Sequence, residues 1–271
     1  MRKALLVGIN KYQNGSNLYG CVNDITNIRD ILINYYGYQV ADIRVLADER
    51  ATYDNIMDRL GWLITDAQEG DNLVFHYSGH GSQIRDRNGD ELKDDMDEII
   101  CPHDMNWEDK YISDDQFAEI FNRMNGGTLD VILDSCHSGT GTRNPYRTRY
   151  MKPPVDILCR QEDGLPIRGL FSWFMSIFAG ANDEADKPFI RMNHSLLAGA
   201  RCNQTAADAD IDGIPNGAFT YFLCKHIRLA NGNITRSILK NRTKDSLKYN
   251  GFDQVPQLEA PKKLFHGLAF T

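Results

Sequence analysis

Residues 129–139 read LDVILDSCHSG, an apolar run that ends abruptly in an acid, a serine, a cysteine and a histidine. Residues 4–9 (ALLVGI) and 72–77 (NLVFHY) have the same form, because each is short, rich in branched side chains and not alternating in polarity. Runs of this kind are typical of strands that are buried on both faces of a parallel sheet. We therefore predict that these segments belong to one parallel sheet, with reactive groups just beyond its carboxyl edge.

Helical patterns separate these runs. Residues 24–37 place isoleucines and leucines on one face, and residues 52–67 begin at Thr52, a good capping residue. Further helices are predicted at residues 113–124, 217–230 and 234–249, and further strands at residues 43–48 and 195–201. Because strands that alternate with helices imply crossover connections, the expected fold class is α/β. We expect a sandwich with a mostly parallel central sheet and helices on both faces.

The composition describes an ordinary soluble globular chain, since 42% of the 271 residues are hydrophobic and 25% are charged. One domain is expected, and a monomer. The net charge of −7 argues against a surface for nucleic acid or anionic lipid. Six scattered cysteines indicate reduced thiols, and no run reaches the ~18 apolar residues of a membrane span. The start of the chain lacks a signal-peptide core, so a cytoplasmic location is predicted.

Two predicted strands end in groups that suit nucleophilic catalysis. Residues 72–81 (NLVFHYSGHG) bring His80 to the edge where Cys136 lies. A thiol needs a neighbouring base to attack a carbonyl, and His80 is the natural one. The N–H groups of Gly81 and Cys136 are the candidates to receive the oxyanion of the tetrahedral intermediate. No acid or amide is obviously placed to orient His80, so a backbone carbonyl is the candidate for that task.

Each of these residues also has a simpler interpretation. A cysteine after a buried strand is most often an inert core residue. His76 and His80 have the HxxxH spacing of zinc ligands, but that spacing works best on a helix and no third ligand is near. His76 is better interpreted as a packed core histidine. The residues alone leave these alternatives open.

The segments HYSGHG (76–81) and DSCHSG (134–139) together resemble the catalytic pair of a metacaspase, in the wider caspase-like family of cysteine peptidases. The histidine and cysteine are 136 − 80 = 56 residues apart, close to the spacing of caspases, although the caspase cysteine motif is absent. Further matching segments are GCVNDI (20–25), residues 86–102, ISDDQF (112–117), ARCNQTAAD (200–208) and NGAFTYFL (216–223). The resemblance implies that Cys136 is the nucleophile and His80 the general acid/base. It also implies a large-subunit-like region (residues 1–139) and a small-subunit-like region (residues 194–271), joined by a segment (140–193) that matches nothing.

The same resemblance implies a primary pocket for arginine or lysine, lined by Cys21, Asp24, Ser78 and Asp134. Asp134 lies two residues before Cys136, so strand parity directs both side chains to one face. Asp24 follows the first strand at the same edge, although a favourable acid at a helix N-terminus is an alternative role. Two carboxylates favour arginine over lysine, because a guanidinium pairs with carboxylates bidentately. The expected partners are therefore proteins or peptides with arginine or lysine before the cleaved bond.

Acidic residues crowd into residues 86–98, and Asp114 and Asp115 follow. Part of this stretch mimics an EF-hand loop, but the final glutamate and the flanking helix pair are missing. By resemblance to metacaspases, calcium is the expected activator, held by Asp97, Asp114 and Asp115, with Asp95 as an alternative. Oxygen ligands of this kind suit calcium rather than zinc.

Residues 140–193 form a basic loop or insertion just downstream of Cys136, with residues 171–178 (FSWFMSIF) as a possible short helix. We hypothesise self-cleavage or occlusion of the active site there. The candidate residues are Arg143, Arg147, Arg149, Lys152, Arg160 and Arg168. The alternative is a solvated basic loop.

Two other functions compete with an arginine-specific cysteine endopeptidase. A legumain-like or true caspase-like enzyme would keep the fold and change the pocket, but Asp24 and Asp134 oppose an aspartate pocket. A caspase-like scaffold with little or no peptidase activity would bind partners without cutting. Loss of His80 or Cys136 would be its signature, and both are present.

Overall fold

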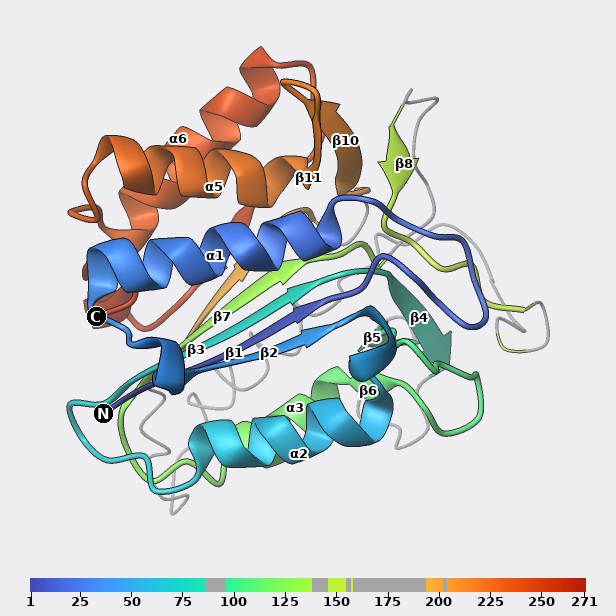
Figure 1. The fold of residues 1–271 in the computed structure, drawn as a ribbon, viewed down its shortest axis with the longest axis horizontal. Coiled ribbons are helices and arrows are strands. Elements are labelled where there is room, and N and C mark those ends of the chain that lie inside the picture. Colours follow the sequence, from blue (N-terminus) through green and yellow to red (C-terminus); the bar gives the residue numbers. More distant parts are fainter. Residues whose placement is uncertain (86–95, 138–145, 155–156, 158–193, 202–203) are drawn as a thin grey trace, which may run out of the picture.

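A computed structural model of the chain describes residues 1–85, 96–137, 146–154, 157, 194–201 and 204–271. Its centre is a six-stranded sheet in the order β12-β9-β7-β3-β1-β2 (Figure 1). The strands are β1 (Arg2–Gly8), β2 (Ile43–Ala47), β3 (Asn72–Ser78), β7 (Thr128–Asp134), β9 (His194–Ala198) and β12 (Gln257–Glu259). All neighbours pair in parallel except β12, which runs antiparallel to β9. The predicted, mostly parallel sheet is confirmed.

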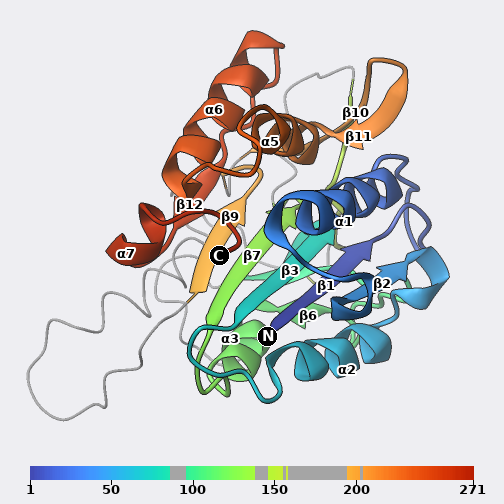
Figure 2. The ribbon, with the colours of Figure 1, turned by 60° about the vertical axis from the view of Figure 1, so that its left-hand side comes forward.

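Helices cover both faces of this sheet, as predicted. One face carries α1 (Cys21–Tyr36), α5 (Ala218–Leu229) and α6 (Arg236–Tyr249), and the other carries α2 (Tyr53–Ile64) and α3 (Asp114–Phe121). Figure 2 shows the two layers from a second direction, with the short α7 (Lys262–Phe265) beside β9. Two 3-10 turns, η1 (Val40–Asp42) and η2 (Asp48–Arg50), flank β2. Among the described residues, no helix is both long and apolar enough to cross a membrane.

The double burial of the sheet explains why its strands do not alternate in polarity. In β1, Leu5 and Val7 belong to the apolar cluster that contains α2 and α3 side chains. Ala4 and Leu6 point the other way and belong to the cluster that contains α1 and α5 side chains. Both faces of one strand are therefore core, which is the physical origin of the pattern ALLVGI.

Capping residues start α2 and α3 where the sequence predicts, whereas α1 begins at Cys21, three residues before the predicted start and without a side-chain cap. The Thr52 hydroxyl accepts the N–H of the residue three positions on, and Ser113 forms a reciprocal capping box with Gln116. The helices α2 and α3 end about one turn earlier than predicted, at Ile64 and Phe121. Neither end has a glycine C-cap of the kind that ends α1 at Gly37.

Two small antiparallel sheets lie at the carboxyl edge of the central sheet and were not predicted (Figure 1). One contains β4 (Gly81–Arg85), β5 (Met96–Ile100) and β6 (Ile112–Ser113); the other contains β8 (Arg147–Thr148), β10 (Ala207–Ile211) and β11 (Ile214–Gly217). The end of the acidic stretch is therefore part of strand β5. Of residues 140–193 only 146–154 and 157 are described, so Arg143, Arg160, Arg168 and residues 171–178 lie outside the described residues.

Candidate active site

Strand register brings the predicted nucleophile and base to one edge. Ser78 at the end of β3 is paired with Asp134 at the end of β7, and Cys136 lies two residues beyond that strand. His80 follows β3, and both side chains are buried. Gly81 packs so closely on the Cys136 backbone that a Cβ atom there would overlap the Cys136 carbonyl oxygen. Only glycine permits this approach, which places the N–H groups of residues 81 and 136 side by side.

The His80 ring is oriented by a backbone carbonyl. Its Nε2 lies 2.7 Å from the Ser16 carbonyl oxygen, so Nε2 carries the hydrogen and donates it. Its Nδ1 has no hydrogen-bond partner within the described residues and keeps its lone pair. Tyr12 stacks on the ring with centroids 4.7 Å apart. Burial lowers the pKa of His80 below its ordinary value, although the hydrogen bond with Ser16 opposes this, so the imidazole is neutral.

Cys136 is a neutral thiol in this arrangement. Burial raises its pKa to about 12, although backbone N–H groups near the sulfur favour the thiolate. One of these groups, the Ala206 N–H, donates to Sγ at 2.5 Å. A thiol in this state must lose its proton to a base during attack, and the Nδ1 lone pair of His80 is suited to accept it.

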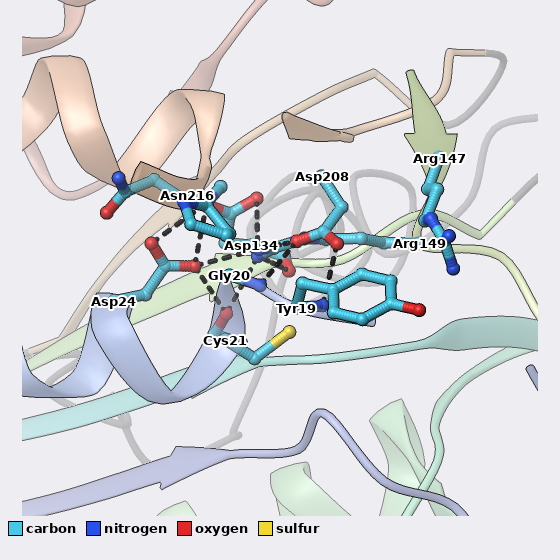
Figure 3. Close-up of polar contacts among 12 residues, drawn as sticks. Tyr19, Gly20, Cys21, Asp24, Asp134, Arg147, Arg149, Asp208 and Asn216 are labelled. Atoms are coloured by element: carbon cyan, nitrogen blue, oxygen red, sulfur yellow. Dashed lines mark hydrogen bonds and ion pairs between the residues drawn. The ribbon is translucent and has the colours of Figure 1, made fainter. Parts of the chain in front are cut away.

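A buried arginine from the basic segment occupies the predicted pocket. Arg149 is fully buried, and its guanidinium lies 2.8 Å from an Asp24 carboxylate oxygen, 3.0 Å from Asp208 and 3.3 Å from Asp134 (Figure 3). It also donates to the Ser78 hydroxyl at 2.7 Å and to the Asp134 carbonyl at 3.1 Å. Burial opposes the charge, but the surrounding carboxylates hold the pKa of Arg149 above its ordinary value. The solvated-loop interpretation is wrong for this residue, whereas Arg147 and Lys152 are exposed.

The backbone of Arg149 is hydrogen-bonded to both predicted oxyanion donors. Its carbonyl oxygen accepts the N–H of Gly81 at 2.9 Å and the N–H of Cys136 at 3.2 Å. Its own N–H donates to the Ala206 carbonyl at 3.2 Å, and β8 just before it pairs antiparallel with β10. The two predicted oxyanion donors therefore meet on the carbonyl of the residue whose side chain fills the pocket.

Three of the four predicted pocket residues, Asp24, Ser78 and Asp134, contact the guanidinium. Cys21 lies fully buried at the start of α1, close enough for Arg149 to favour its thiolate, but burial dominates and raises its pKa above the ordinary value. Burial is also the main cause that raises the pKa of Asp24 to about 6, while Arg149 lowers it.

Asp208, the third acid of the pocket, was not predicted from the sequence. Its carboxylate binds the guanidinium and accepts the backbone N–H groups of Tyr19 at 2.8 Å and Gly20 at 2.9 Å. Asp208 is the last residue of the segment ARCNQTAAD, so the matching motif was the available signal. Thr220 was missed as well: its N–H and hydroxyl bind one oxygen of Asp134, at 3.0 and 2.7 Å.

The predicted calcium ligands lie on neighbouring elements. Asp97 is on β5, while Asp114 and Asp115 form the first turn of α3, directly after the strand that pairs with β5. Among the residues that the structure describes, however, no group of three or more acids, histidines or cysteines is placed to hold a metal ion. Asp95 lies outside the described residues.

The remaining histidine and thiol predictions agree with the structure. His76 is a fully buried core residue, and burial lowers its pKa to about 3. Four cysteines are free thiols: Cys21, Cys101, Cys136 and Cys224. The other two lie outside the described residues.

The fold and the site define a class of protein, a cysteine peptidase on a caspase-like α/β sandwich. The family model described as "Metacaspase, peptidase C14 domain" matches residues 2–145. The chain is 33% identical over 298 residues to Metacaspase-1 of Saccharomyces cerevisiae, covering 99% of this chain and 68% of the relative. It is 31% identical over 300 residues to Metacaspase-1 of Schizosaccharomyces pombe, covering 100% and 69%. The crystal structure of protein GSU0716 from Geobacter sulfurreducens shares the fold, with a TM-score of 0.71, 22% identity and coverage of 100% and 98%.

The chain therefore belongs to the metacaspase family of cysteine peptidases. The predicted resemblance is confirmed, and it extends over nearly the whole chain.

Proposed function

We propose that this metacaspase is an endopeptidase that cleaves after arginine, and after lysine less well, and that the bond after its own Arg149 is a substrate. One observation carries the proposal. The Arg149 guanidinium binds the acidic pocket while the Arg149 carbonyl accepts the N–H groups of Gly81 and Cys136. Side chain and carbonyl of the same residue thus occupy the two places that a cleaved residue must occupy.

The chemistry follows from these positions. Nδ1 of His80 takes the proton of the Cys136 thiol, and the sulfur attacks the carbonyl carbon of the arginyl residue. The oxyanion is held by the N–H groups of Gly81 and Cys136. When the intermediate collapses, the C–N bond breaks and His80 returns the proton to the leaving amine. Water then hydrolyses the thioester, with His80 as its base, and the thiol is regenerated.

The pocket favours arginine for geometric reasons. Two guanidinium nitrogens reach Asp24, Asp134, Asp208 and Ser78 at the same time. A lysine ammonium is a single point charge and engages fewer of these groups at once. Bidentate, charge-assisted hydrogen bonds are roughly twice as strong as neutral ones.

Self-processing between Arg149 and Tyr150 is tested by mass spectrometry of incubated protein. We expect wild type to yield a fragment that begins at Tyr150, and Cys136→Ala to remain intact at this bond. Arg149→Gln should also abolish this cut. Lys152→Gln, which changes an exposed lysine three residues after Arg149, should leave it unchanged. Cleavage of Arg149→Gln at the same bond would contradict an arginine pocket filled by Arg149.

The scaffold alternative is tested on substrates added in trans. We expect wild type to hydrolyse fluorogenic arginyl peptides, lysyl peptides more slowly and aspartyl peptides not at all. Cys136→Ala should hydrolyse none of them. Equal, residual rates for wild type and Cys136→Ala would favour a binding scaffold.

Calcium activation is a separate proposal, supported by the resemblance and by the nearness of Asp97 to the first turn of α3 rather than by a formed site. The test is a calcium titration of chelator-treated protein with an arginyl peptide. Asp97→Asn should shift the response to higher calcium, while Asp58→Asn, at an exposed position of α2, should not. Full activity in chelator would refute the requirement.

We also propose that residues 1–271 form one peptidase domain. The direct pairing of β7 with β9 supports this, because it joins the large-subunit-like region and the small-subunit-like region in one sheet. The monomeric state and the cytoplasmic location stay predictions, the first checked by light scattering and the second by fractionation of cells.

A further inference from the structure

We propose that the enzyme selects its substrates at two positions beyond the arginine pocket: a basic residue two positions before the cleaved arginine, and an aromatic residue three positions before it. This inference rests on the proposed function and names the substrate class of the same site. The three residues before Arg149 are Tyr146, Arg147 and Thr148. Their contacts show which surface of the enzyme a substrate residue would contact at each of these positions.

The segment before Arg149 is held as an added strand. Thr148 is paired with Ala207 and Arg147 with Asp208 in an antiparallel ladder, and the Arg149 N–H continues it to Ala206. A peptide that adds a strand to a sheet edge gains affinity from the main chain and specificity from its alternate side chains. Any substrate whose arginine enters the pocket along β10 meets the same surfaces in the same order.

Arg147, which occupies the basic position, lies over an aromatic ring. The guanidinium carbon of Arg147 is 4.1 Å from the centroid of Tyr19, and one of its nitrogens is 3.4 Å from the Asn17 carbonyl oxygen (Figure 3). Tyr19 is 50% exposed, so the ring is open to an incoming side chain. Its backbone N–H is held by Asp208, the same residue that binds the arginine in the pocket. The pocket therefore anchors the backbone that carries this ring.

Tyr146, which occupies the aromatic position, packs on a small apolar cluster. The ring of Tyr146 is 4.8 Å from that of Phe252, which is itself buried in a cluster with Phe222 and Leu247. Thr148, between these two positions and the cleaved arginine, is exposed. The third residue before the cleaved arginine thus meets an aromatic surface, the second meets the Tyr19 ring, and the arginine itself meets the acidic pocket. Among the described residues, no enclosed surface surrounds the residue directly before the arginine.

The test compares fluorogenic tetrapeptides on wild-type protein. The parent is Tyr-Arg-Thr-Arg, and single replacements by alanine vary each of the first three positions. Replacing the basic residue should lower kcat/KM about two- to fivefold, the value of an exposed cation–π contact. Replacing the aromatic residue should lower it about two- to twelvefold, and replacing threonine should leave it unchanged. Competition by Arg149 slows all peptides alike, so these ratios are unaffected.

Enzyme variants assign the effect of the basic residue to Tyr19. Tyr19→Ala should remove the preference for the basic residue, and Tyr19→Phe should keep it, because both rings bind a cation. Tyr249→Ala, at a 90% exposed tyrosine on α6, should behave as wild type. Cleavage of all arginyl tetrapeptides at one rate would overturn this inference and leave the proposed function standing. Cleavage of none would overturn both.

Discussion

Removing the charge of Arg149 should destabilise the protein even when no cleavage is possible. Among the described residues, Arg149 is the one cation that contacts Asp24, Asp134 and Asp208. In a Cys136→Ala background, Arg149→Gln leaves these buried carboxylates without a partner. Breaking a buried ion pair costs about 3–5 kcal/mol, and we expect the lower end because the emptied pocket admits water. For a chain of this size, a loss of about 3 kcal/mol lowers Tm by roughly 6–12 °C.

The assay is thermal unfolding of three proteins that share Cys136→Ala. The matched control is Arg147→Gln, since this arginine is exposed two residues before Arg149 and loses only a surface cation–π contact, worth about 1 kcal/mol or less. Agmatine, a small guanidinium compound, should raise Tm of the Arg149→Gln protein in a concentration-dependent way. It should have little effect on the control, whose pocket is already filled.

Two results would refute this reasoning. Equal Tm values for Arg149→Gln and Arg147→Gln would mean that the carboxylates do not depend on the guanidinium. An agmatine response of the same size in both proteins would mean that agmatine binds elsewhere.

Three further predictions concern the pocket. The pKa of Asp24 is raised to about 6 with arginine bound and is higher without it, because Arg149 lowers it. The affinity of Arg149→Gln protein, whose pocket holds no competing arginine, for arginyl peptides should therefore fall as pH falls toward about 6 and recover at higher pH; a flat profile of 1/KM for this variant would contradict this. Asp208→Asn should lower kcat/KM for arginyl peptides about 10- to 100-fold, the value of a hydrogen bond to a charged group. Asp210→Asn, at an exposed position two residues along β10, is the control and should have no effect. Thr220→Val should raise KM about tenfold because Asp134 loses the hydroxyl that orients it. Thr220→Ser keeps the hydroxyl and should behave as wild type; equal KM values for both variants would refute the orienting role.

Much of the fold was predictable because local patterns and burial agree. The run ALLVGI (4–9) is apolar at every position because alternate side chains enter two different cores. The small antiparallel sheets were not predictable in the same way. Strand β8 has two residues, and its conformation is set by pairing with β10, about 60 residues further along the chain. Local propensity carries no signal for such a contact.

The pocket residues divide in the same way, into those that a local sequence pattern predicts and those that only contacts between distant segments place. Asp24 and Asp134 were predictable because each follows a recognisable strand of the sheet. Asp208 was not predicted from the local pattern, because the segment ADADI (207–211) presents two acids of equal parity, Asp208 and Asp210. One is 6% exposed and binds the guanidinium, whereas the other faces solvent. In the fold, the approach of Tyr19 and Gly20 from the start of the chain distinguishes them; in the sequence, the segment ARCNQTAAD, which ends at Asp208, was the available signal.

The acidity of the pocket explains why the chain fills it with an arginine. Buried carboxylates without a cation raise the free energy of the folded protein, so binding of a nearby arginine in the empty pocket is favourable. Arg149 is tethered only 13 residues after Cys136 (149 − 136), and a short tether gives effective concentrations of about the millimolar range. A substrate must therefore compete with an intramolecular ligand of the same chemistry. Cleavage after Arg149 leaves this arginine attached to the Cys136 side of the cut, so we expect it to compete after processing as well. Activation then requires displacement of the strand from β10, and Arg149→Gln in otherwise wild-type protein should lower KM for arginyl peptides while leaving kcat unchanged.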